Sequence, residues 1–310
     1  MRILILGITG MLGHAVWLNL KDKYETFGSI RSNIEDLSGR CSLFNRDDKN
    51  IIGGINLLDD NDLKRALDIG RPGVIVNCVG IVKQLPEARS PIPSISLNAL
   101  FPHRLAKMCE ERDIRLIHFS TDCVFSGNKG NYAEGDISDA YDLYGRTKYL
   151  GEVTGDRSLT IRTSIVGRQL FGSSGLFEWF LSQRGEVRGY RKAVFSGLTT
   201  YAVAEIIRML IERHPTVCGL YHVSSEAINK YDLLNRVNEA LNLDIDVIPA
   251  DSIVMDRSLD STRVRELTHI YIPVWGEMIE DFVKRVQDYK KWRYEKIKQE
   301  DQREKRRDLD

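Results

Sequence analysis

Residues 1–20 read MRILILGITGMLGHAVWLNL: a strand-like run, a glycine turn and a helix-like run follow one another. The apolar residues 2–6 end at Gly7, as a buried parallel strand does. Apolar residues then recur at helical spacing over residues 11–20. The turn has the spacing GxxGxxG, in which glycine allows a tight bend and lets backbone N–H groups approach a pyrophosphate. This order of elements predicts a dinucleotide site at the helix N-terminus, and the alternative is a purely structural turn.

The choice between the two nicotinamide dinucleotides depends on the second strand. An NAD-preferring site usually carries an acidic residue about 20 positions after the glycines, which binds the ribose 2′-hydroxyl. Residues 28–33 read GSIRSN, so Arg31 stands there and no acid does. Arginine accommodates a 2′-phosphate through its forked donors. The sequence therefore predicts NADP (NADPH) as the cofactor.

Strands and helices alternate over residues 1–167. We expect strands at 24–30, 51–55, 73–77, 114–120 and 159–167, and helices at 62–69, 94–112 and around Tyr144. This alternation predicts an α/β fold with a Rossmann-like doubly wound parallel sheet. The later pattern is looser and predicts a smaller, non-contiguous α/β substrate lobe. We assign 1–167 to an NADP-binding Rossmann domain to which 198–223 returns, 168–197 and 224–285 to the substrate lobe, and 286–310 to a charged C-terminal helix or tail.

Composition narrows the class of protein. The 310 residues carry a formal net charge of +0, which gives no reason to expect nucleic acid or an anionic membrane as partner. No apolar run approaches the roughly 18 residues of a membrane span. The five cysteines are scattered without a CxxC pair, so we expect neither a disulfide framework nor a metal site. These features predict a soluble, cytoplasmic protein.

A tyrosine and a lysine four residues apart are the candidate catalytic pair. Residues 143–152 read LYGRTKYLGE, with Tyr144 and Lys148 on one helix face. The strand before them ends at Ser120 and Thr121, and ligands of a doubly wound sheet bind beyond the carboxyl ends of its strands. Hydroxyl, phenol and ammonium are therefore predicted to converge, and the ammonium is expected to lower the pKa of the phenol. The alternative is an ordinary surface contact.

These motifs together resemble the extended short-chain dehydrogenase/reductases. Residues 120–152, STDCVFSGNKGNYAEGDISDAYDLYGRTKYLGE, are similar to the active-site segment of the dTDP-4-dehydrorhamnose reductases and their relatives. The resemblance implies NADPH-dependent reduction of a 4-keto-6-deoxy nucleotide sugar, dTDP- or UDP-linked, in deoxysugar or cell-surface polysaccharide biosynthesis. It makes Tyr144 the proton donor, Lys148 the partner of the nicotinamide ribose and Thr121 the ligand of the ketone oxygen.

The resemblance also implies the remaining cofactor and substrate contacts. Residues expected to touch the cofactor are Gly7, Thr9, Gly10, Met11, Leu12, Gly13, Arg31, Asn56, Leu57, Cys78, Val79, Gly80, Ser120, Tyr144, Lys148 and Ile165. Residues expected to touch the nucleotide-sugar substrate are Lys83, Thr121, Asp122, Cys123, Arg257, Asp260 and Ser261. Arg257, Arg263 and Arg265 are read as a cluster of phosphate ligands, with a solvated helix face as the alternative.

One departure bears on the reaction. Related dehydratases carry glutamate directly after a Thr-Asp pair, and this chain has Cys123 there. A thiol is a poor substitute for a carboxylate base, so 4,6-dehydration is not expected. Two other activities stay open: a non-catalytic NADP-binding regulatory subunit, and a nucleotide-sugar epimerase. Because many relatives pair through the helices of the Rossmann lobe, the resemblance also implies a homodimer.

Overall fold

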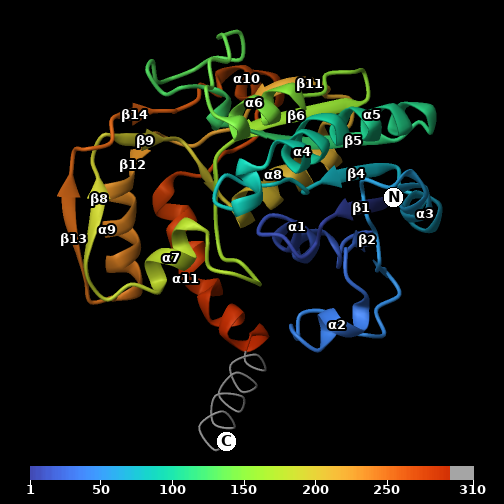
Figure 1. Cartoon of the computed structure of the whole chain (residues 1–310), viewed down its shortest axis with the longest axis horizontal. Coiled ribbons are helices and arrows are strands. Elements are labelled where there is room, and N and C mark those ends of the chain that lie inside the picture. The colour runs from blue at the N-terminus through green and yellow to red at the C-terminus, as the bar shows by residue number, and fades with distance from the viewer. Residues whose placement is uncertain (294–310) are drawn as a thin grey trace, which may run out of the picture.

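A seven-stranded, all-parallel sheet forms the centre of the molecule (Figure 1). The computed structural model describes residues 1–293. The strand order is β11-β6-β5-β4-β1-β2-β3, so the chain reverses direction across the sheet between β1 and β4. The predicted doubly wound sheet is confirmed. Its strands are β1 (Arg2–Leu6), β2 (Glu25–Ser29), β3 (Ile51–Ile52), β4 (Val74–Asn77), β5 (Arg115–Thr121), β6 (Ser158–Thr163) and β11 (Gly219–His222).

Helices cover both faces of this sheet, and the first strand shows how the sequence arranges them. Ile3 and Ile5 belong to one apolar core with α1 (Gly13–Leu20), α8 (Thr200–Arg213) and α11 (Trp275–Trp292). Leu4 and Leu6 belong to a second core with α3 (Asp60–Gly70) and α5 (Phe101–Glu111). Successive side chains of a strand point to opposite faces, which explains why the strand is apolar throughout.

The helix predicted over residues 94–112 is longer and interrupted. It begins with α4 (Pro91–Ser94), continues as a π-helical segment over Ile95–Leu100 and ends as α5. Pro102 has no N–H to donate to the carbonyl of Asn98. That carbonyl oxygen lies only 1.9 Å from where a Cβ on Gly151 would be, so the irregular turn packs directly against the end of α6 (Leu143–Leu150).

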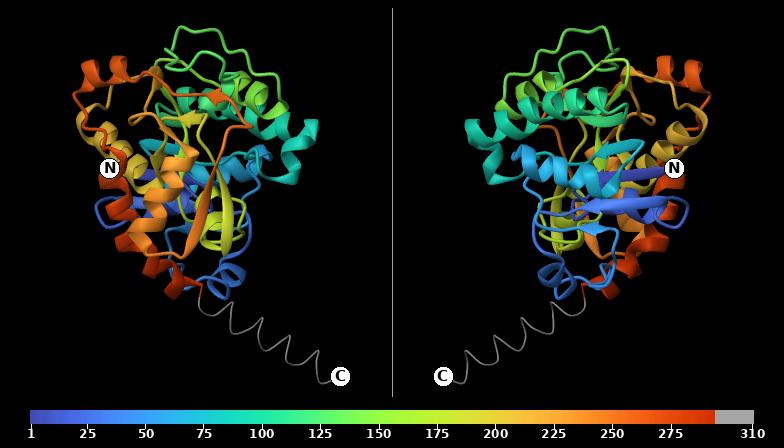
Figure 2. Two further views of the ribbon diagram at one scale, coloured as in Figure 1. Left: turned by 90° about the vertical axis from the view of Figure 1, so that its left-hand side faces the viewer. Right: turned by 90° about the vertical axis from the view of Figure 1, so that its right-hand side faces the viewer.

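Three small sheets and the remaining helices lie beside the main sheet. β8 (Gly185–Tyr190) pairs with β13 (Ile245–Ala250), and α9 (Lys230–Leu241) packs along this pair (Figure 2). The other strands are β7 (Ile165–Val166) with β10 (Leu198–Thr199), and β9 (Ala193–Phe195) between β12 (Ile228–Asn229) and β14 (Met255–Asp256). The short helices are α2 (Ile34–Ser38), α7 (Leu176–Leu181) and α10 (Thr262–Thr268).

The domain boundaries predicted above stay a prediction. β11 joins the main sheet beside β6, whereas the strand expected over residues 159–167 is divided into β6 and β7. The predicted tail falls within α11 up to Trp292, and residues 294–310 lie outside the described residues. None of the helices within residues 1–293 has the length and apolar character needed to cross a membrane.

Candidate active site

The glycine turn between β1 and α1 is built so that a side chain would obstruct it. Gly7 has a φ of +82°, and its N–H lies 3.2 Å from both the carbonyl and the hydroxyl oxygen of Ser29. A Cβ on Gly13 would lie 2.0 Å from the carbonyl oxygen of Gly7. The first helix therefore starts directly against the end of the first strand, as a pyrophosphate-binding turn requires. A dinucleotide fits these residues.

The close packing around Gly13 predicts that an added side chain there lowers both stability and NADPH affinity. The variant Gly13→Ala is expected to lower the free energy of unfolding by about 1–3 kcal/mol, because an added methyl group overpacks the turn. Affinity for NADPH should fall with it. Gly135→Ala is the matched control, because nothing lies within 4 Å of its added Cβ. Urea unfolding and NADPH titration test both variants, and NADPH affinity unchanged in Gly13→Ala would contradict the assignment.

The other predicted cofactor residues follow the ends of neighbouring strands. Arg31 lies just beyond β2 and is exposed, and Asn56 and Leu57 follow β3. Cys78, Val79 and Gly80 continue directly from β4, and Ile165 lies on β7 just beyond β6. These positions surround the point where the strand order reverses, which is where such sheets bind ligands. Their contacts with a cofactor stay a prediction.

Thr121, Tyr144 and Lys148 are brought together. Thr121 is the last residue of β5, and Tyr144 and Lys148 lie on α6. The Tyr144 phenol lies close enough to Thr121 for this side chain to lower the phenol pKa, and the Thr121 hydroxyl donates to Asp122 Oδ1 at 3.1 Å. The Lys148 Nζ donates to the carbonyl oxygen of Phe119, at 2.6 Å, and lies 3.9 Å from where a Cβ on Gly80 would be. Lys148 is 7% exposed, so the reading of this pair as a surface contact is wrong.

Burial shifts the pKa values of both Lys148 and Tyr144. Burial lowers the pKa of Lys148 to about 8, and the nearby Glu152 carboxylate partly opposes this shift. Burial also raises the pKa of Tyr144, and the neighbouring Cys123 raises it further. The expected lowering of the Tyr144 pKa by the ammonium is therefore wrong. The Lys148 ammonium is held by the carbonyl oxygen of Phe119, and Thr121 is the neighbour that lowers the pKa of Tyr144 against these effects.

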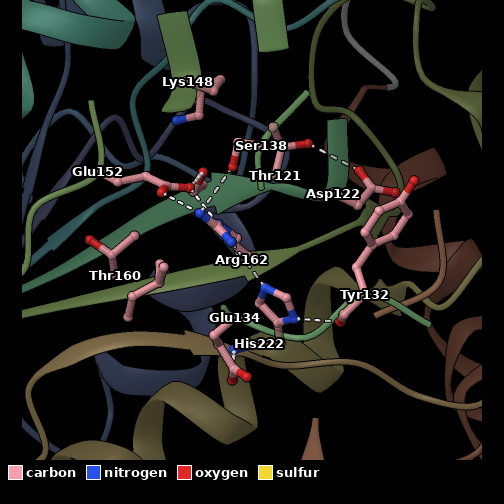
Figure 3. A network of polar contacts seen from close by, with 12 residues as sticks. Thr121, Asp122, Tyr132, Glu134, Ser138, Lys148, Glu152, Thr160, Arg162 and His222 are labelled. Atoms are coloured by element: carbon pink, nitrogen blue, oxygen red, sulfur yellow. Dashed lines mark hydrogen bonds and ion pairs between the residues drawn. The ribbon is translucent and has the colours of Figure 1, made fainter. Parts of the chain in front are cut away.

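A buried ionic network lies behind this group (Figure 3). Arg162 on β6 binds both carboxylate oxygens of Glu152, at 2.7 Å each. Ser120 donates its hydroxyl to the same carboxylate at 2.6 Å, so this side chain serves the network, and its predicted cofactor contact stays a prediction. His222 lies at the end of β11. Its Nε2 is 3.3 Å from Arg162 Nη1, and its Nδ1 is 2.9 Å from the carbonyl oxygen of Tyr132. Arg162 is therefore a buried ion partner of Glu152 beside the site.

The chain matches a known protein family over most of its length. The family described as "RmlD substrate binding domain" matches residues 1–288 of this chain. The chain belongs to the RmlD substrate binding domain family. This is a family of NAD(P)-dependent nucleotide-sugar reductases, and relatives of the chain also include proteins named methionine adenosyltransferase 2 subunit beta.

Individual relatives are distant but extensive. A Haloferax volcanii protein described as a "probable low-salt glycan biosynthesis reductase" is 26% identical over 90% of this chain and 92% of its own length. The dTDP-4-keto-6-deoxy-D-glucose reductase of Streptomyces niveus is 30% identical over 49% of this chain and 46% of its own length. The Xenopus laevis methionine adenosyltransferase 2 subunit beta is 27% identical over 78% of this chain and 72% of its own length.

Solved structures support the same family fold. A hypothetical dTDP-4-dehydrorhamnose reductase from Sulfolobus tokodaii is 27% identical, with a TM-score of 0.72 over 89% of this chain and 98% of that one. The dTDP-4-dehydrorhamnose reductase of Bacillus anthracis, in complex with NADP, has a TM-score of 0.75 over 91% of this chain and 98% of that one. At 19% identity, the second shows the fold alone.

The predicted substrate residues of this RmlD family member separate into two groups. Lys83 pairs with Asp142 at 2.6 Å, and Asp142 caps α6 by accepting the N–H of Gly145. Arg257 donates from Nη1 to the Cys123 sulfur at 3.4 Å. Asp122, beside Cys123, is buried, and burial raises the pKa of its carboxyl group. Lys83, Asp122, Cys123 and Arg257 thus lie around the end of β5.

The second group lies around α10 instead. Asp260 accepts the N–H of Thr262, and Ser261 donates to the carbonyl oxygen of Ser224. Arg265 binds Ser261 and that carbonyl, and Arg263 lies over the Tyr221 ring, 4.6 Å from its centroid. The predicted cluster of Arg257, Arg263 and Arg265 is therefore wrong, because the three guanidinium groups point to different partners. A substrate role for Asp260 and Ser261 stays a prediction.

Lys230, the first residue of α9, is a further side chain near this group that the sequence did not predict. Its ammonium is within electrostatic reach of Asp122, Cys123, Arg257 and Lys83. No motif signals this residue, because only the pairing of β12, β9 and β14 brings it to the site. Residues 1–293 contain no group of three or more His, Cys, Asp or Glu side chains that could hold a metal ion.

Proposed function

We propose that this chain reduces the ketone at C4 of a 4-keto-6-deoxy nucleotide sugar, dTDP- or UDP-linked, with NADPH as the reductant. The observation that carries the proposal is the convergence of Thr121, Tyr144 and Lys148 at the end of β5, beside a glycine turn shaped for a dinucleotide. The Streptomyces niveus relative, a dTDP-4-keto-6-deoxy-D-glucose reductase, supports this substrate class. The Haloferax volcanii relative, a probable glycan biosynthesis reductase, supports a place in glycan synthesis.

The side chains of this site perform the proton half of the reduction. Bound NADPH supplies the hydride to the ketone carbon. Thr121 donates a hydrogen bond to the ketone oxygen, and Tyr144 gives its phenolic proton to the developing alkoxide. Because its pKa is raised, Tyr144 is protonated at neutral pH and ready to act as an acid. Lys148 holds the nicotinamide ribose, and the carbonyl of Phe119 fixes its position.

Arg31 provides a test of the cofactor assignment. The variant Arg31→Ala is expected to weaken NADPH binding by roughly 10- to 100-fold, because a charge-assisted hydrogen bond contributes about 1.5–3 kcal/mol. NADH, which lacks the 2′-phosphate, should bind as before and is the internal control. Titration of nicotinamide fluorescence measures both affinities. An equal loss for the two cofactors would contradict a specific contact with the 2′-phosphate.

The activity itself is tested with a panel of 4-keto nucleotide sugars and NADPH, followed at the nicotinamide absorbance. Stoichiometric consumption of NADPH with one member of the panel supports a reductase. Conversion without net consumption supports the epimerase alternative. No conversion with any member contradicts the proposal. The homodimer implied by the resemblance is a separate proposal, which sedimentation of the full chain tests.

A second function is favoured by one observation. Several relatives are named methionine adenosyltransferase 2 subunit beta, so a member of this family can be a subunit of another enzyme. The corresponding proposal is that this chain binds NADP and regulates a partner. The proton-donating group formed by Thr121 and Tyr144 argues for catalysis instead. Loss of NADPH consumption in a Tyr144 variant that still binds NADPH separates the two functions.

A further inference from the structure

A buried histidine stands at the start of α1, directly after the glycine turn. The side chain of His14 is inaccessible to solvent. Its Nδ1 lies 2.8 Å from the carbonyl oxygen of Gly10, which also accepts the backbone N–H of His14 at 3.2 Å. Its Nε2 lies 2.5 Å from the hydroxyl oxygen of Tyr289 on α11. His14 therefore joins the turn to a helix from the far end of the chain.

The hydrogen bonds around His14 can run in one direction only. A carbonyl oxygen accepts and never donates, so Nδ1 carries the ring proton. Burial lowers the pKa of His14 to about 4, so the ring is neutral at neutral pH and Nε2 has no proton. The Tyr289 hydroxyl must then donate to Nε2, and it is left to accept from the Tyr201 hydroxyl at 3.2 Å. Each bond in this series supports the next.

Tyr289 is itself held firmly by its neighbours. The guanidinium carbon of Arg168 lies 5.0 Å from the centroid of the Tyr289 ring, and Trp292 meets the same ring edge to face at 5.0 Å. Glu178 on α7 binds Arg168 Nε at 2.5 Å and Arg293 Nη1 at 3.0 Å. The position of the Tyr289 hydroxyl is therefore set by α7 and α11 together.

The end of α11 reaches two parts of the chain that are predicted to hold the dinucleotide. One is the glycine turn, through His14. The other is the segment that follows Arg31, where the N–H of Ser42 donates to the carbonyl oxygen of Trp292 at 3.3 Å, beside α2 (Figure 1). The family match covers residues 1–288, so Tyr289 and Trp292 lie beyond it. This support of the turn is therefore a feature of the present chain outside the matched residues.

We propose that His14, held in place by Tyr289, is a positioning residue that fixes the glycine turn for the pyrophosphate of the cofactor. This inference rests on the proposed function, in which NADPH is the reductant. The C=O of one residue and the N–H of the next point in opposite directions across a trans peptide bond. Drawing the Gly10 carbonyl toward His14 thus directs the N–H of Met11 out of the N-terminus of α1, where an anion binds. A turn fixed before binding loses less entropy when the cofactor arrives.

Two ligands separate a positioning role from a general structural one. NADPH contacts the turn through its pyrophosphate, whereas adenosine 2′-monophosphate carries the 2′-phosphate and no pyrophosphate. In the full-length chain, His14→Leu is expected to weaken NADPH binding by roughly 3- to 10-fold, the loss of one neutral hydrogen bond, and to leave binding of adenosine 2′-monophosphate unchanged. His14→Asn keeps a donor in place of Nδ1 and should restore most of the affinity. Fluorescence titration and competition measure the two ligands.

Tyr289→Phe tests the second half of the series by removing a single oxygen. NMR of the histidine ring nitrogens should show a protonated Nδ1 and an unprotonated Nε2 for His14 in the wild type, and Tyr289→Phe should shift the Nε2 signal and weaken NADPH binding. The matched control is Tyr271→Phe, which removes an exposed hydroxyl that donates to Glu277 and should bind NADPH as wild type does.

The outcomes also separate this inference from the proposed cofactor. A wild type that binds no NADPH overturns the proposed cofactor and this inference with it. If the wild type binds NADPH, then unchanged affinity in His14→Leu, an equal loss for both ligands, or a ring proton on Nε2 overturns the role of His14 alone. Circular dichroism shows whether each variant is folded, and if His14→Leu is not, unchanged NADPH affinity in Tyr289→Phe overturns the inference in its place.

Discussion

Replacing Tyr144 with phenylalanine is expected to lower kcat for NADPH-dependent ketone reduction by roughly 100- to 10,000-fold, the usual contribution of a positioned general acid. The variant removes one oxygen and keeps the ring, so the packing of α6 should not change. The phenol lies beside Thr121, and its raised pKa keeps the proton in place at neutral pH. Steady-state rates at the nicotinamide absorbance, with the preferred sugar of the panel, measure the effect.

The control lies on the same helix. Tyr149 is 47% exposed, and Tyr149→Phe removes the same oxygen outside the site, so its rate should match the wild type. NADPH affinity should be similar in both variants, because the phenol does not hold the dinucleotide turn. A Tyr144→Phe variant that keeps near-full turnover would show that another group supplies the proton.

The main sheet could be predicted because contiguous stretches of the sequence signal most of its strands. The strands β1, β3 and β4 are short, largely apolar runs, and the glycines at 7, 10 and 13 mark where the first strand ends and the helix begins. The small sheets were harder to predict. β9, β12 and β14 have two or three residues each, too short for alternation to be visible in the sequence. Their pairing depends on contacts between segments far apart in the chain.

In the candidate site too, residues of one contiguous segment could be predicted, and residues brought in from distant segments could not. Thr121, Tyr144 and Lys148 could be found because one contiguous segment carries them. Lys230 could not, since its place depends on the pairing of β12 with β9, a segment distant in the chain from Thr121, Tyr144 and Lys148. The grouping of Arg263 and Arg265 with Arg257 was wrong for the related reason that closeness in sequence does not fix where long side chains point. The predicted lowering of the Tyr144 pKa was wrong because a sequence motif does not show how deeply the phenol is buried.

A few residues of the active-site segment without a proposed catalytic role, among them Ser120, Tyr132 and Glu152, belong to the buried ionic network. Glu152 lies one helical turn after Lys148 and is bound by Ser120 and Arg162. Tyr132 stacks on Phe125 and, through its backbone carbonyl, contacts His222. The network therefore connects α6 to three neighbouring strands of the sheet, β5, β6 and β11. We infer that it fixes the position of α6 relative to the end of β5.

The variant Arg162→Met tests that inference and is expected to lower the free energy of unfolding by about 3–5 kcal/mol, because it leaves a buried carboxylate without its partner. Arg162 and Glu152 are 3% and 7% exposed at their side chains. The matched control is Arg191→Met, since Arg191 also binds both oxygens of a carboxylate, Asp251, but is 54% exposed. Surface pairs contribute only about 0–1 kcal/mol, so urea unfolding should separate the two variants clearly.

A double variant distinguishes loss of the pair from loss of packing. Combining Arg162→Met with Glu152→Gln removes both charges, so no ion is left buried and alone, and part of the stability should return. If Arg162→Met costs no more than Arg191→Met, the buried pair does not stabilise the fold. If the double variant is no more stable than Arg162→Met, the cost lies in the packing of Arg162, whose guanidinium carbon lies 5.2 Å from the centroid of the Phe125 ring, and not in the unpaired Glu152 carboxylate.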